Sequence, residues 1–304
     1  MELRKIDFSS APPEELGAAL DEAFRSSGFA ALTGLPVPGA LVQDAYHASR
    51  AFFDQDAAYK QRFRYRSSSE NFGYQGMREE NLDPGAPADL KETFTMRNVS
   101  LAPLGPERWP TPEYRALMVR FYEAMFDAGL TIARILAHAL NVEVETFARQ
   151  HSGENVTLRL LLYPSCDPGL PEVQQLGAGA HTDYGLLTLL LQDDVGGLQI
   201  RDRQGTWRDV PPDPETVLIN CGDMLERWSN GRYLSTEHRV KVNTSGRSRM
   251  SIAMFMDPDS TTEITALPSC VSADNPARYP PITAGAHLAE KLNASHKDRY
   301  HQQS

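Results

Sequence analysis

A succession of short apolar runs fills the second half of the chain, and it restricts the possible folds more than any other feature. Glycine, proline, aspartate and asparagine separate these runs. Closely spaced short strands of this kind are typical of a β-sandwich or barrel. We therefore expect a mainly β protein in which an antiparallel sheet rolls up inside a helical wrapper. The runs span residues 156–163, 174–181, 186–192, 197–201, 206–210, 216–220, 236–242 and 249–256.

The first half of the chain carries helix signals instead. Apolar residues recur at helical spacing after Pro13, and Gly28 is expected to end that helix. A second helix is expected over residues 39–53, where apolar residues again form one stripe. Thr111 can cap a helix that begins at Pro112, so a long helix is predicted there, on which the sheet would pack.

Three further segments complete the prediction. Residues 29–32 are expected to form a strand, and residues 288–296 a helix with a frayed end beyond it. Residues 64–90 are rich in glycine, proline and serine and are expected to be irregular. The chain is thus divided into an N-terminal mixed α/β region, a supporting helix, a β-rich core and a C-terminal segment, at residues 1–100, 101–150, 151–260 and 261–304.

Composition excludes several classes of protein. The 304 residues carry a formal net charge of −10, which argues against nucleic acid as the main partner, although a local basic pocket is compatible with it. No apolar run approaches the about 18 residues of a membrane helix, and no signal peptide is expected. The three cysteines, which are far apart, suit a reducing cytoplasm. We therefore expect a cytoplasmic protein with a small-molecule substrate and no membrane partner.

The β-rich half contains three chemically suggestive motifs in order. His181 and Asp183 are two residues apart, so on a strand their side chains would project from the same face. His238 stands at the head of a later apolar run. Arg249 and Ser251 again share one strand face, eleven residues after His238. Each motif alone is common, but their order within a β-rich region is far more specific.

Two histidines and one carboxylate on one face of a metal leave its other coordination positions open, as in non-haem Fe(II) oxygenases. An oxoacid and O₂ could then bind the same metal, while Arg249 holds the far carboxylate of the oxoacid and Ser251 adds a hydrogen bond. A zinc hydrolase is the competing metal site, but no HExxH motif supplies its general base. A hydrogen-bond cluster at strand ends is the alternative without a metal.

At these residues the chain resembles the isopenicillin N synthase-like branch of the 2-oxoglutarate/Fe(II) dioxygenases, over nearly its whole length. His181-Thr182-Asp183, His238-Arg239-Val240 and Arg249-Met250-Ser251 carry the likeness. Further similar segments are Ser27-Gly28-Phe29, Asp89-Leu90-Lys91-Glu92-Thr93-Phe94, Leu158-Arg159-Leu160-Leu161-Leu162-Tyr163-Pro164, Gly196-Gly197-Leu198-Gln199, Asn220-Cys221-Gly222-Asp223 and Trp228-Ser229-Asn230-Gly231.

The resemblance implies a double-stranded β-helix, or jelly roll, with iron(II) in its mouth. His181, Asp183 and His238 would bind the metal, and Arg249 and Ser251 would hold the distal carboxylate of 2-oxoglutarate. Tyr163 would donate a hydrogen bond to co-substrate or substrate. Members of the family use O₂ and convert 2-oxoglutarate to succinate and CO₂ while they hydroxylate, desaturate or cyclise a small metabolite.

One position departs from the family pattern, because Leu161 stands where plant members often carry asparagine. In the family, the N-terminal irregular segment and the C-terminal tail cover the mouth of the site. An arginine there, Arg64 or Arg78, would suit a carboxylated substrate. The candidate substrate residues are Arg64, Tyr65, Tyr74, Arg78, Trp228 and Phe255.

Two other functions remain open. An iron oxidase of the same fold would not use 2-oxoglutarate, and its arginine-serine pair would face the substrate instead. A catalytically silent binding protein would retain the fold alone. The intact set of metal ligands together with Arg249 argues against the silent protein, since a scaffold has no physical need for them.

Overall fold

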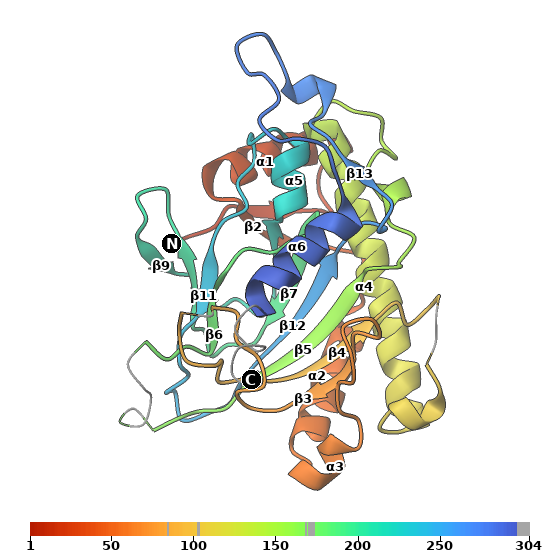
Figure 1. The fold of residues 1–304 in the computed structure, drawn as a ribbon, viewed down its shortest axis with the longest axis vertical. Helices are drawn as coiled ribbons and strands as arrows, with labels where there is room; N and C mark the ends of the chain where they lie inside the picture. The colour runs from red at the N-terminus through yellow and green to blue at the C-terminus, as the bar shows by residue number, and fades with distance from the viewer. Residues whose placement is uncertain (84, 102–103, 168, 170–173, 297–304) are drawn as a thin grey trace.

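The computed structural model describes the backbone of residues 1–83, 85–101, 104–167, 169 and 174–296, and the side chains as far as Lys291 (Figure 1). The strands are β1 Lys5–Asp7, β2 Phe29–Thr33, β3 Phe72–Gln75, β4 Glu92–Arg97, β5 Thr157–Tyr163, β6 Ala178–His181, β7 Leu187–Gln192, β8 Leu198–Arg201, β9 Trp207–Asp209, β10 Val217–Cys221, β11 His238–Val240, β12 Arg249–Met256, β13 Glu263–Ile264 and β14 Ile282–Thr283. The α-helices are α1 Pro13–Ser27, α2 Gly39–Phe53, α3 Ala57–Gln61, α4 Pro112–Ala139, α5 Asp223–Trp228 and α6 Ala284–His296.

Two sheets form the core of the fold. The larger has the strand order β1-β2-β10-β7-β12-β5-β4-β3, and the smaller has the order β6-β11-β8-β9. Within both sheets every pairing is antiparallel except that of β1 with β2. This is the double-stranded β-helix, or jelly roll, with helices around it, and each of the eight apolar runs contains one strand.

Alternation along the strands separates a packed core from a cavity. On β12, Met250, Ile252, Met254 and Met256 are buried in the main apolar core. The intervening residues, from Arg249 to Phe255, line a cavity between the sheets. Because side chains in a strand point alternately to opposite faces, one run of sequence supplies both the core and the site.

Three helices cover the outer face of the larger sheet. Helix α4 packs on β12 and also contacts α1 and α2, and Figure 1 shows it running beside β5 and β12. The Thr111 hydroxyl accepts a hydrogen bond from the Tyr114 amide, so the predicted cap is confirmed. Gly28 ends α1 at φ 73°, a left-handed conformation that favours glycine.

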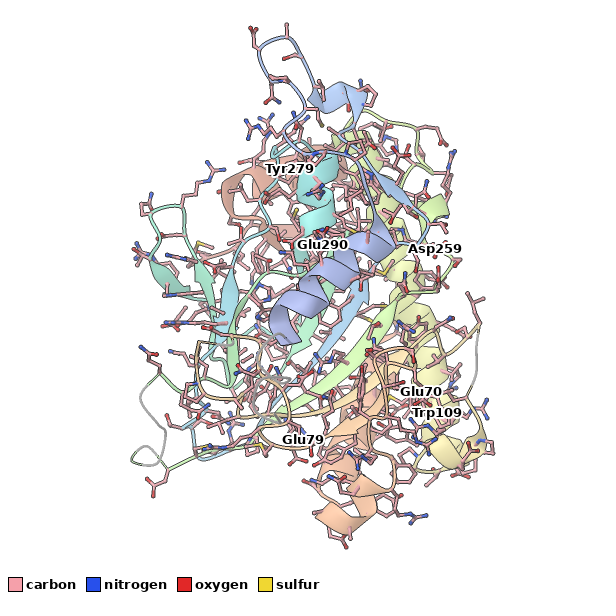
Figure 2. The ribbon with its side chains drawn as sticks, viewed as in Figure 1. Glu70, Glu79, Trp109, Asp259, Tyr279 and Glu290 are labelled. Atoms are coloured by element: carbon pink, nitrogen blue, oxygen red, sulfur yellow. The ribbon has the colours of Figure 1, made fainter. Side chains whose placement is uncertain are left out.

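The expectation for residues 64–90 was partly wrong. Strand β3 lies within this segment and extends the larger sheet beside β4. The carboxylate of Glu70 is bound by Arg108, and Trp109 packs on Phe72, which ties the segment to the start of α4 (Figure 2). The pattern was missed because β3 has only four residues, among them Gly73.

The C-terminal helix is also longer than expected, since α6 begins at Ala284 rather than near Leu288. The expected frayed end falls on residues 297–304, outside the described part of the chain. Strands from the first hundred residues share a sheet with strands that follow residue 150, and the four sequence regions stay a prediction. Among the described helices, none is both long and apolar enough to cross a bilayer.

Candidate active site

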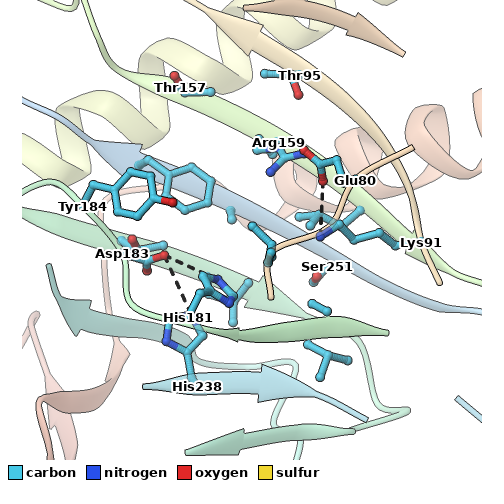
Figure 3. A pocket seen from close by; sticks show the side chains of 18 of the residues that line it. Glu80, Lys91, Thr95, Thr157, Arg159, His181, Asp183, Tyr184, His238 and Ser251 are labelled. Carbon is cyan, nitrogen blue, oxygen red and sulfur yellow. Dashed lines mark hydrogen bonds and ion pairs between the residues drawn. The ribbon is translucent and has the colours of Figure 1, made fainter. Parts of the chain in front are cut away.

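The smaller sheet carries the two histidines. His181 ends β6 and His238 begins β11, and the antiparallel pairing sets them directly opposite each other. The Oδ1 atom of Asp183 lies 3.9 Å from Nε2 of His181 and 3.8 Å from Nε2 of His238. One potential ligand atom from each residue lies within 4.8 Å of the other two (Figure 3). The predicted ligands therefore meet at one point.

Backbone carbonyls fix the orientation of both imidazole rings. Nδ1 of His181 lies 2.7 Å from the carbonyl oxygen of Gly179, and Nδ1 of His238 lies 3.1 Å from that of Thr236. A ring that donates from Nδ1 keeps its proton there and presents the Nε2 lone pair to a metal. Both Nε2 atoms face Asp183, so the arrangement suits a divalent cation.

Asp183 is buried, and only one of its oxygens faces the histidines. Its Oδ2 accepts a hydrogen bond of 2.7 Å from the side-chain amide of Asn220, a buried residue of β10. Burial alone would raise the pKa of Asp183, but the two imidazoles and Asn220 outweigh it and hold the pKa below its ordinary value. Burial and the neighbouring His238 lower the pKa of His181. An ionised Asp183 carboxylate beside a neutral His181 imidazole is the state that metal binding requires.

The same cavity, of about 380 Å³, contains a buried arginine. Arg249 is 1% exposed, and its guanidinium lies 4.7 Å from the centre of the Tyr163 ring. It donates hydrogen bonds of 3.3 Å to the Ser251 hydroxyl and to Oε1 of Gln192, while its Nε has no partner in the described part of the chain. No carboxylate of the described residues forms an ion pair with it.

A buried guanidinium without a counter-charge is costly, and a carboxylate brought by a ligand would remove that cost. The residues present therefore fit both groups that the sequence implies. A 2-His-1-carboxylate set suits iron(II), and Arg249 with Ser251 suits the far carboxylate of an oxoacid. Zinc would use the same donors, but Arg249 would then have no role.

A second group of polar residues lines the same cavity and is called here the polar wall: Glu80, Lys91, Thr95, Thr157 and Arg159. Glu80 lies 2.6 Å from Nη2 of Arg159 and 3.2 Å from Nζ of Lys91 (Figure 3). Burial raises the pKa of Glu80, but Arg159 and Lys91 prevail and lower it to about 2. The Glu80 carboxylate is therefore ionised at neutral pH.

Asp89 connects the polar wall to the metal-binding strand. It is 1% exposed, forms an ion pair of 2.7 Å with Lys91, and accepts a hydrogen bond from the Gly179 amide. The carbonyl of the same Gly179 orients His181. Asp89 thus has a structural role, whereas Lys91 lines the cavity.

The candidate substrate residues separate into two groups. Tyr65 and Phe255 line the cavity. Tyr74 is buried against Phe52 and its hydroxyl contacts Glu92, while Trp228 is buried against Phe147. The side chains of Arg64 and Arg78 are exposed outside the cavity wall.

Arg64, Tyr74, Arg78 and Trp228 thus lie outside the set of residues that line the cavity, and their contact with a substrate stays a prediction. The sequence motif identified the right segments but not which face of each segment is turned to the cavity. The cavity lining gives no support to a carboxylated substrate, which was inferred from an arginine at position 64 or 78.

Sequence reasoning missed the polar wall, yet a signal for part of it was present. Tyr163 was assigned to the site, and strand alternation places Leu161, Arg159 and Thr157 on the same face. All four line the cavity. Glu80 could not have been found in this way, because it lies in an irregular segment outside any strand.

The geometry agrees with a family comparison. Residues 150–258 match the family described as the 2OG-Fe(II) oxygenase superfamily, and residues 3–112 match the family described as non-haem dioxygenase in morphine synthesis N-terminal. The 2-oxoglutarate-Fe(II) type oxidoreductase hxnY of Emericella nidulans is 32% identical over 317 aligned positions, which cover 97% of this chain and 89% of that protein. The chain belongs to the 2-oxoglutarate/Fe(II) oxygenase superfamily. It is an iron(II)- and 2-oxoglutarate-dependent oxidoreductase.

Other relatives of this oxygenase cover similar shares of the chain. A homoarginine-6-hydroxylase of Oryza sativa subsp. japonica is 32% identical, with 90% of this chain and 87% of that protein aligned. The crystal structure of a full-length Neurospora crassa protein in complex with alpha-KG has a TM-score of 0.87 at 28% identity, covering 96% of both chains. JOX2 in complex with 2OG, Fe and JA has a TM-score of 0.83 at 30% identity, covering 95% of this chain and 85% of that one.

Proposed function

We propose that His181, Asp183 and His238 bind iron(II) in this oxygenase, and that Arg249 and Ser251 hold the distal carboxylate of 2-oxoglutarate. The observation that carries the proposal is one cavity that contains both a three-donor cluster and a buried arginine without a carboxylate partner among the described residues. The first needs a cation and the second needs an anion. An iron ion chelated by an oxoacid satisfies both needs together.

With iron bound, the metal supplies O₂ activation coupled to the oxidative decarboxylation of 2-oxoglutarate. One oxygen atom goes to succinate as CO₂ leaves, and the other goes to the substrate, whose C–H bond becomes C–OH. We propose hydroxylation as the outcome. Asn220 orients the Asp183 carboxylate, and the carbonyls of Gly179 and Thr236 orient the two imidazoles.

Tyr163 has two parts in the proposal. Its ring lies against the Arg249 guanidinium and limits the directions that the cation can face. Its position opposite Arg249 on β5 also brings it into the cavity wall, where its hydroxyl can donate to an oxygen of 2-oxoglutarate or of the substrate. Leu161, two residues earlier, faces the same cavity but offers no hydrogen bond.

The polar wall supports a small substrate with hydrogen-bonding groups and little net charge. The two cations, Arg159 and Lys91, are balanced by Glu80 and Asp89. The buried Nε of Arg159 and hydroxyl of Thr95 have no partner among the described residues, so a substrate must offer acceptors or donors to them. The structural neighbour from Neurospora crassa has also been crystallised with alpha-KG and thymine, a molecule of this chemical type.

An anaerobic titration with iron(II) tests the proposal. Adding 2-oxoglutarate to the iron-loaded protein should produce a weak visible charge-transfer band, because the oxoacid chelates the metal. Succinate formed on addition of O₂ should then rise with a substrate from a panel of small polar heterocycles and amides. Iron binding without the band would favour the oxidase that does not use 2-oxoglutarate, and no iron binding would contradict the ligand assignment. A cytoplasmic location and the absence of nucleic-acid and membrane partners stay predictions.

A further inference from the structure

A second hollow, separate from the active site, is rich in arginine. It has a volume of about 580 Å³ and shares no lining residue with the catalytic cavity. Its guanidinium groups come from distant parts of the sequence, and we call this cluster the arginine hollow: Arg25, Arg203, Arg232 and Arg278. In a chain of net charge −10, four cations around one depression are an unusual concentration of positive charge.

The cations of the arginine hollow are poorly neutralised. Among the described residues, Asp21 is the carboxylate that forms ion pairs with them, 2.6 Å from Arg232 and 3.4 Å from Arg25. Within the described part of the chain, no carboxylate forms an ion pair with Arg203 or Arg278. Four positive charges against one negative charge leave a net local charge of +3. Such a surface attracts an anion that carries several charges.

Several contacts fix the loop that carries Arg278. The buried side chain of Asn230 donates to the carbonyls of Cys270, Asn275 and Pro276 and accepts from the Arg278 amide. The hydroxyl of Tyr279 donates to Glu226, and Figure 2 shows Tyr279 against α5. The loop is therefore held in place by α5, through Glu226, and by Asn230, which follows that helix.

Gly231 makes room for the guanidinium of Arg278. A Cβ atom at this position would lie 2.8 Å from Nη1 of Arg278, and the backbone φ of 76° also favours glycine. Arg203 reaches across to donate to the carbonyl of Arg25, so α1, the turn after β8 and the C-terminal loop meet here. Ser269, Ser272 and Asn275 add polar groups to the lining.

We infer that the arginine hollow binds a phosphate group, either as inorganic phosphate or as part of a phosphorylated metabolite. Arginine presents paired donors that match phosphate oxygens, and its charge does not depend on pH near neutrality. The serine hydroxyls can complete the coordination. This inference is independent of the proposed roles at the iron site.

Calorimetry with the full-length protein tests this inference. The protein is loaded anaerobically with iron(II) and excess 2-oxoglutarate so that Arg249 is occupied, then titrated at low ionic strength with inorganic phosphate or with glucose 6-phosphate. We expect one binding event per chain. Tighter binding of the sugar phosphate would identify a phosphorylated metabolite as the source, and tighter binding of phosphate would identify the free anion. Absence of binding by both would overturn the inference.

Matched variants locate the binding event. The double variant Arg203→Gln/Arg278→Gln should weaken binding by about tenfold or more, because two charge-assisted contacts are lost. The control Arg66→Gln/Arg120→Gln removes the same charge from exposed positions outside the hollow and should change affinity less than about twofold. An equal loss of affinity in both double variants, or no loss in Arg203→Gln/Arg278→Gln, would show that the hollow does not bind phosphate. Thermal unfolding of each variant verifies that it is folded.

Discussion

The guanidinium of Arg249 lies 4.7 Å from the ring centre of Tyr163, and the two residues face each other across β12 and β5. This pairing holds a buried cation at the wall of the catalytic cavity without giving it a counter-charge. A flat ring restrains the guanidinium but leaves its N–H groups available. The relationship explains how the fold can retain a buried arginine that forms no ion pair with a described carboxylate, as the proposed binding of 2-oxoglutarate requires.

Replacing Arg249 by glutamine should weaken the binding of 2-oxoglutarate more than the binding of iron(II). A buried charge-assisted contact is worth about 2–5 kcal/mol, so the KM for 2-oxoglutarate should rise by at least about thirtyfold. Iron affinity should change little, because Arg249 is not a metal ligand in the proposal. The control is Arg247→Gln, whose exposed guanidinium pairs with Asp194 at the surface. An unchanged KM in Arg249→Gln would remove the arginine from the co-substrate site.

Replacing one of the three proposed iron ligands should abolish turnover. In His181→Ala only two donors remain near the metal, and we expect iron(II) affinity to fall by at least about tenfold. Binding is followed by equilibrium dialysis and turnover by succinate release. His47→Ala, at an exposed position on α2, serves as the control and should behave like the wild type. Full activity of His181→Ala would disprove the ligand assignment.

Asn220 is expected to act through Asp183 as a positioning residue. Asn220→Ala removes the hydrogen bond that holds Oδ2 of the carboxylate, so iron(II) affinity should fall by about 10–100-fold. Excess iron should restore most of the turnover, because the ligands themselves remain. Turnover that stays low at saturating iron would instead indicate a role for Asn220 in the reaction.

Glu80 provides a test of pH-dependent stability. Its pKa of about 2 is below the ordinary 4.5, so its contribution to folding is present above about pH 4.5 and is lost as the pH falls toward 2. Glu80→Gln should destabilise the protein by about 3 kcal/mol at pH 7, since two buried cations lose a partner. Urea unfolding at pH 7, 4 and 3 should show this difference shrinking as the pH falls. A difference that is constant with pH would contradict the ion-pair explanation.

Arg159 should influence the substrate rather than the co-substrate. In Arg159→Gln we expect the KM for the substrate to rise by about tenfold, while the KM for 2-oxoglutarate and the iron–oxoacid band stay unchanged. Arg159→Lys serves as the control for loss of the ion pair with Glu80, because lysine retains the positive charge but lacks the buried Nε donor. Equal effects on substrate and 2-oxoglutarate would place Arg159 outside the substrate-binding wall.

The residue pattern predicted a rolled antiparallel sheet in a helical wrapper, and the family resemblance implied the jelly roll and the meeting of His181, Asp183 and His238. The pairing of β6 with β11 sets His181 opposite His238, whereas Asp183 lies two residues beyond the end of β6, and the order of the motifs is specific. The caps of α1 and α4 were predicted as well, because they depend on neighbouring residues only.

Only the tertiary structure decided which residues enclose the substrate space. Arg64 and Tyr74 were plausible by position, but the first faces solvent and the second packs into the core. Glu80 and Arg159 come from segments 79 positions apart in the sequence and meet only because the chain folds them together. The arginine hollow arises in the same way, from charges that the net composition conceals. Long-range contacts of this kind depend on how the layers pack, and no local pattern of residues encodes them.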